Sequence, residues 1–110
     1  MNGSEPDPDY DLRQIALMEE QLSQFEAGRI ALPHLIAGLK ALLSCMRTLG
    51  QDWKESFQKE WWTLEQVHAV ALDRKETVLS LEDLTLIKEA TGNLRTLIAD
   101  VRERLEPSQS

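Results

Sequence analysis

The chain has 110 residues, and its 19 acidic and 12 basic residues give it a formal net charge of −7 at pH 7. This length corresponds to one domain. The acidic balance argues against nucleic acid or an anionic membrane as a partner, because both attract basic surfaces. A basic protein partner fits the charge, although the same charge also serves solubility alone.

Targeting and redox signals in the sequence are few. Residues 1–9 contain neither a basic region nor an apolar stretch, so we expect no signal peptide, and charges interrupt every apolar segment before it reaches the length of a membrane span. Cys45 is the only cysteine, which excludes an intramolecular disulfide and a cysteine-based zinc site. These features predict a cytoplasmic protein. Because Leu42, Leu43 and Met46 lie close by in the sequence, we expect Cys45 to be a buried apolar residue.

The N-terminal part of the chain changes from a polar stretch to a helical pattern. Residues 1–10 are polar and rich in acids, and we expect them to form a disordered acidic tail. Apolar residues at three- and four-residue spacing then predict the first helix over 11–26. We expect Asp9 or Asp11 to cap its start and Gly28 to end it.

A second helix is predicted from Pro33 to Gly50. Proline is tolerated in the first turn, and glycine commonly follows the last. Gly38 lies on one flank of this helix, where a neighbouring helix can approach closely. The apolar stripe of this helix consists of Leu35, Ile36, Leu39, Leu42, Leu43, Met46 and Leu49.

The third predicted helix, from Asp52 as its cap to Arg74 or Lys75, contains all three tryptophans of the chain. About 22 residues would make it about 33 Å long, as long as the domain itself. At about 100° per residue, one broad face collects Trp53, Phe57, Trp61, Leu64, Val67, His68 and Ala71. We expect this face to lie in the core.

The fourth helix has the clearest start signal, since Ser80 and Asp83 resemble a capping box. Its apolar stripe consists of Leu84, Ile87, Thr91, Leu94, Ile98, Val101 and Leu105. We expect it to continue through Gly92 and to be followed by a disordered tail over 107–110. No stretch alternates at period two, which argues against a sheet. The sequence therefore predicts an all-α domain over 11–106, a compact four-helix antiparallel bundle.

Residues that could carry chemistry are sparse. Glu65 and His68 have the Glu-x-x-His spacing of a di-iron carboxylate site, but that site needs a second such pair. The only other histidine, His34, has no glutamate three residues before it. The sequence also lacks a glycine-rich phosphate loop and a nucleophile elbow. We therefore predict no catalytic residue, no metal site, no cofactor and no enzymatic activity.

Trp62 does not fit the pattern of its own helix. It points nearly opposite to the core face, among Glu55, Glu65 and Asp73. If other helices cover both faces, Trp62 belongs to the core. If it is exposed, it is a candidate interface residue, because tryptophan is enriched at the centres of interfaces. We take Glu55, Trp62, Glu65 and Asp73 as candidate partner-binding residues, suited to a partner rich in Lys and Arg.

The motif Trp-Trp-x-Leu-Glu at 61–65, preceded by Trp53 and Phe57 and followed by the Ser-Leu-Glu-Asp start at 80–83, resembles a group of small all-helical bacterial proteins. These belong to toxin–immunity loci, including contact-dependent growth-inhibition systems, and the resemblance covers roughly residues 12–105. It implies a cytosolic immunity protein, or antitoxin, without catalytic residues. Such a protein binds and blocks the toxic domain of its cognate partner, often a basic nuclease. The alternative is a structural helical adaptor or a homodimerising subunit without a toxin partner.

Overall fold

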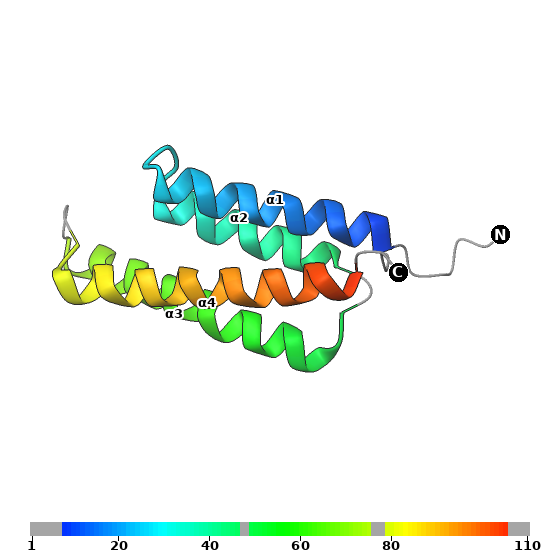
Figure 1. The fold of residues 1–110 in the computed structure, drawn as a ribbon. Helices are drawn as coiled ribbons and strands as arrows, with labels where there is room; N and C mark the ends of the chain where they lie inside the picture. Colours follow the sequence, from blue (N-terminus) through cyan, green and yellow to red (C-terminus); the bar gives the residue numbers. More distant parts are fainter. Residues whose placement is uncertain (1–7, 47–48, 76–78, 106–110) are drawn as a thin grey trace.

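The computed structural model describes residues 8–46, 49–75 and 79–105 and places four helices in them. They are α1 (Pro8–Glu26), α2 (Leu32–Cys45), α3 (Gln51–Asp73) and α4 (Leu81–Leu105). Each helix packs against two others, in the cyclic order α1, α2, α3, α4, and consecutive helices run in opposite directions (Figure 1). This arrangement confirms the predicted all-α, four-helix antiparallel bundle. Within the described ranges, no helix is long and apolar enough to cross a membrane.

The first helix begins earlier than the sequence pattern predicted. α1 starts at Pro8, where the missing proline N–H costs nothing. Asp9 and Asp11 therefore lie in the first turn of the helix and not before it, where acids suit the positive end, and the side chain of Asp11 is fully buried. The rest of the predicted acidic tail, residues 1–7, lies outside the described residues. Gly28 follows the helix with a φ of 78°, the left-handed conformation that glycine adopts without strain.

The boundary between the second and third helices also differs from the prediction. α2 opens with Pro33 in its first turn as expected, but it ends at Cys45, and Gly50 is the N-cap of α3 instead of the end of α2. Asp52 consequently lies in the first turn of α3 and is not its cap. The prediction that Cys45 is buried was wrong as well, because it lies about 200° around the helix from the buried Leu43 and is exposed.

The core draws fully buried side chains from all four helices. Phe57 lies at its centre, and its ring is 5.2 Å from the ring of the buried Trp53. Gly38 of α2 lies against Gln21 of α1, where an added Cβ would come within 2.8 Å of the Gln21 side-chain oxygen, as expected for a close helix approach. The fully buried apolar residues are Ile15, Met18, Leu22, Leu35, Leu39, Phe57, Leu64, Leu94, Ile98 and Val101.

Two ion pairs connect α1 to α4 at the edge of this core. Arg95 donates to Glu26 at 2.7 Å, and Arg102 donates to Glu19. The hydrogen bond to Glu26 raises the pKa of the Arg95 guanidinium above its already high usual value. Both side chains of the Arg95–Glu26 pair remain more than a third exposed, so the pair contributes at most about 1 kcal/mol to the packing of α1 on α4.

The start of α4 has the predicted cap. The backbone N–H of Asp83 donates to the hydroxyl of Ser80 at 3.1 Å, and the helix continues without a break through Gly92. The predicted apolar stripe is buried from Ile87 to Val101, but Leu84 is 48% exposed, so its assignment to the core was wrong. Leu84 is exposed because α4 is longer than the helices that pack against it.

The α3–α4 hairpin is longer than its partners and projects beyond them. α3 and α4 have 23 and 25 residues, whereas α2 has 14. At 1.5 Å per residue, α4 is about 37 Å long and α2 about 21 Å. The end of α3 and the start of α4 therefore extend past the turn that joins α1 to α2 (Figure 1). In this overhang the exposed apolar residues are Val70, Leu72, Leu81, Leu84 and Leu86.

Candidate functional site

The three tryptophans of α3 lie in different surroundings. Trp53 is only 6% exposed and donates its indole N–H to the Leu97 carbonyl of α4 at 3.0 Å. Trp61 is half-buried and donates to the Ile36 carbonyl of α2 at 2.8 Å. Trp62 is 54% exposed, and no hydrogen bond of its indole is seen within the described part of the chain. Two tryptophans thus hold α3 to both of its neighbours, and the third is on the surface.

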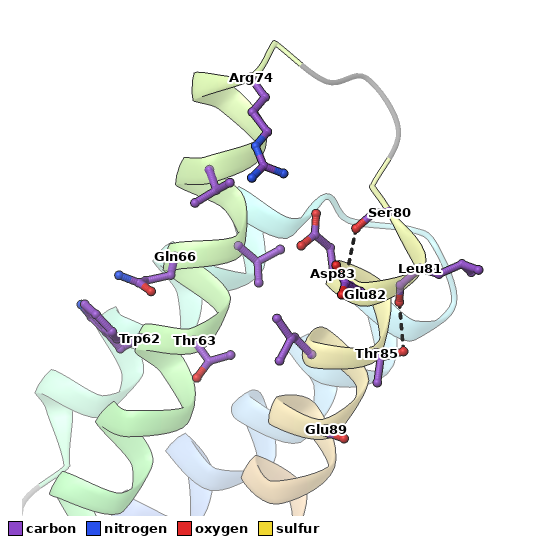
Figure 2. Close-up of a pocket in the computed structure, with 13 residues that line it drawn as sticks. Trp62, Thr63, Gln66, Arg74, Ser80, Leu81, Glu82, Asp83, Thr85 and Glu89 are labelled. Carbon is purple, nitrogen blue, oxygen red and sulfur yellow. Dashed lines mark hydrogen bonds between the residues drawn. The ribbon is translucent and has the colours of Figure 1, made fainter.

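The exposed Trp62 stands at the edge of a groove of about 810 Å³ between α3 and α4, which we call the α3/α4 groove. The side of the groove that α3 provides is lined by Trp62, Thr63, Gln66, Val67, Val70 and Arg74. The side that the start of α4 provides is lined by Ser80, Leu81, Glu82, Asp83, Thr85, Leu86 and Glu89. Figure 2 shows the ring of Trp62 on the outer side of α3 and the side chain of Leu81 pointing outward from the start of α4.

The α3/α4 groove combines an apolar floor with an acidic wall. Val70 and Leu86 are 42% and 44% exposed, so neither is covered by the rest of the bundle. Three acids, Glu82, Asp83 and Glu89, come from α4, whereas Arg74 is the only basic residue among those that line the groove. The groove therefore suits an apolar side chain with a cation close beside it.

One acceptor atom in the groove lacks a donor. The Oδ2 atom of Asp83 is buried, and no described residue donates a hydrogen bond to it. Arg74 and Asp83 both point into the space between the two helices (Figure 2), but they do not form an ion pair. A buried carboxylate oxygen without a donor is unfavourable, and it adds to the negative charge of this wall of the groove.

A second groove lies on the other side of Trp62, between α2 and α3. Its volume is about 560 Å³, and it is lined by Lys40, Leu43, Gln58, Lys59, Trp61 and Trp62. The Lys40 ammonium lies 5.6 Å from the centre of the Trp61 ring. Trp62 thus forms a ridge between an acidic and a basic groove, and any partner that covers the ridge contacts at least one of them.

The four candidate residues from the sequence are only partly brought together. Trp62 lines both grooves. Glu55, Glu65 and Asp73 are all exposed on α3, but none of them lines the α3/α4 groove. By helix geometry Glu55 and Asp73 lie about 10 Å and about 16 Å along the axis from Trp62, too far to surround one side chain.

The contribution of α4 to the groove was not predicted from the sequence. Its acids Glu82, Asp83 and Glu89 form the wall that the α3 acids were expected to provide. The signal in the sequence was a surplus of leucines at the start of the fourth helix, where Leu81 and Leu86 fall outside the core stripe.

The Glu-x-x-His pair is not joined by further metal-binding side chains in the part of the chain that the structure describes. Glu65 is exposed and His68 is half-buried on α3. Among the described residues, no group of three or more His, Cys, Asp or Glu side chains is placed to hold a metal ion.

Comparison of the chain with protein-family models, with curated proteins and with solved structures finds no match.

Proposed function

We propose that this protein is an immunity protein, which binds a cognate toxin domain in the cytoplasm and masks the surface that the toxin needs for its activity. The toxin domain is basic under this proposal, as a nuclease domain would be. The role requires tight association and no catalytic residue of the immunity protein itself.

One observation carries the proposal, namely the exposed Trp62 beside an apolar groove with an acidic wall. Tryptophan is among the residues that contribute most to interface energies, because its large ring loses much water-accessible area on binding. The net charge of −7 accelerates encounter with a basic partner, and apolar contact slows dissociation. The resemblance of the Trp-Trp-x-Leu-Glu motif at 61–65 to immunity proteins points to the same role.

Expression of the candidate toxin in growing cells tests the proposal. The candidate toxin for this test is the C-terminal domain of any large secreted protein that is encoded immediately upstream of this gene, and it is induced with and without this protein. We expect growth arrest by the toxin domain alone, full growth with this protein, and a one-to-one complex whose association rate falls as salt rises. Growth that is unaffected when this protein is absent, or growth arrest in its presence, would contradict the proposal.

A further inference from the structure

We infer that the α3/α4 groove is the docking site and that it takes an amphipathic helix of the partner, with aliphatic side chains on its inner face and Lys or Arg beside them. This inference rests on the proposed function and specifies which part of the partner is bound. The position of the groove in the bundle, its size and its charge each favour this kind of partner.

The place of the groove in the bundle favours a helix. Along most of α3 and α4, the helices α1 and α2 complete a four-helix cross-section. At the overhang, where Leu81 and Leu86 are exposed, α1 and α2 no longer reach the hairpin (Figure 1). A partner helix laid along the groove, on the face of the hairpin that α1 and α2 do not cover, would pack between α3 and α4 and cover Trp62, Val70 and Leu86, which this chain leaves exposed.

The size of the groove sets the number of side chains that enter it. Between Trp62 and Arg74 the groove extends along α3 for about 18 Å, which corresponds to about three turns of a partner helix. Its volume of about 810 Å³ holds a few side chains. We therefore expect two or three aliphatic residues at i, i+3 or i+4, and i+7 to contact Val70 and Leu86.

The charge of the groove requires a basic occupant. Glu82, Asp83 and Glu89 line the groove against the single Arg74. A Lys or Arg on the partner helix can pair with the exposed carboxylates of Glu82 and Glu89, and charge assistance makes such hydrogen bonds stronger than neutral ones. A second copy of this chain fits less well, because it would bring two acidic walls together.

A synthetic peptide tests the inference without knowledge of the toxin. The probe is an amphipathic Leu/Lys peptide of about 18 residues, long enough to be helical when bound, and the control peptide has Glu in place of Lys. Binding is measured by titration calorimetry and by the tryptophan emission of the chain, which shifts to the blue when Trp62, the most exposed of the three rings, is covered. We expect the Lys peptide to bind and the Glu peptide to bind at least about 100-fold more weakly.

Two pairs of variants locate the binding site. Leu86→Asp places a charge in the groove, and Leu17→Asp makes the same change on α1, where Leu17 is 51% exposed. Asp83→Asn removes the acceptor charge, and its match is Asp100→Asn on the exposed face of α4. We expect affinity for the Lys peptide to fall about 100-fold in Leu86→Asp and about tenfold in Asp83→Asn, and to change less than twofold in the two controls.

The outcomes separate this inference from the proposed function. Equal affinities of Leu86→Asp and Leu17→Asp would overturn the groove as the binding site and indicate attraction by net charge alone. A homodimer of the unmodified protein that Leu86→Asp dissociates and Leu17→Asp does not would overturn the basic partner in favour of a second copy. Toxin protection that survives Leu86→Asp would overturn this inference while the proposed function stands. Selective peptide binding by a chain that fails to protect cells would support the groove and overturn the proposed function.

Discussion

Replacement of each tryptophan by phenylalanine separates the residues that hold the fold from the one available to a partner. Trp53→Phe removes the N–H that donates to Leu97 at 3.0 Å, a bond that contributes about 1 kcal/mol. It also leaves about 40 Å³ of unfilled space, which costs about 1 kcal/mol at about 24 cal/mol per Å³. The expected loss of unfolding free energy is therefore about 2 kcal/mol. Trp62→Phe changes a side chain that is 54% exposed, and we expect a change below about 0.5 kcal/mol.

Urea unfolding followed by far-UV circular dichroism measures these differences, since fluorescence would itself change with each replacement. Trp53→Phe should lower the midpoint by about 1 M urea, and Trp62→Phe should leave it unchanged. The urea midpoint of Trp61→Phe should lie between those of the other two variants, because Trp61 is only half-buried but loses its hydrogen bond to the Ile36 carbonyl. A loss of unfolding free energy in Trp62→Phe as large as that in Trp53→Phe would place Trp62 in the core and contradict its exposure on α3.

Further predictions concern backbone positions and the helix cap. Gly92→Ala should raise the unfolding free energy by about 1 kcal/mol, because Gly92 lies in a helix interior and nothing stands within 4 Å of the added Cβ. Gly28→Ala should lower it by about 1 kcal/mol, since φ is 78° there; a stabilised Gly28→Ala would contradict the left-handed turn. Ser80→Ala should lower the thermal midpoint by about 4 °C, because it removes the hydroxyl that caps the helix at Asp83. Ser44→Ala should leave the midpoint unchanged, because the Ser44 hydroxyl donates to the Lys40 carbonyl inside its own helix. Equal effects of the two serine variants would exclude the cap.

The sequence predicted the features that depend on local spacing. The number and type of the helices followed from apolar residues at three- and four-residue intervals, and Pro33, Gly28 and Ser80 marked boundaries through their backbone chemistry. Cys45 was misplaced because sequence neighbours were taken as spatial neighbours, whereas residues two apart on a helix point nearly opposite ways. Gly50 was misassigned because a glycine fits both the end of one helix and the start of the next.

The candidate site depended on the arrangement of helices, which single-helix patterns do not contain. The helical wheel placed Trp62 away from the core face, but only the packing of α2 and α4 decides whether that side is covered. The acidic wall at Glu82 and Glu89 became visible only when α4 was placed beside α3. Leu84 continued the apolar stripe of the fourth helix, and it is exposed because α1 and α2 are too short to reach it.

The indole N–H signals of the ¹⁵N-labelled protein, recorded with and without the unlabelled toxin domain, show whether Trp62 lies in the interface with the toxin domain. The chain has three tryptophans, so three signals report in one spectrum, and Trp62→Phe assigns one of them. On binding, the Trp62 signal should move and its exchange with water should slow. The Trp53 signal, buried and bonded to Leu97, should stay in place. A complex that forms while the Trp62 signal keeps its position and its exchange rate would exclude Trp62 from the interface with the toxin domain.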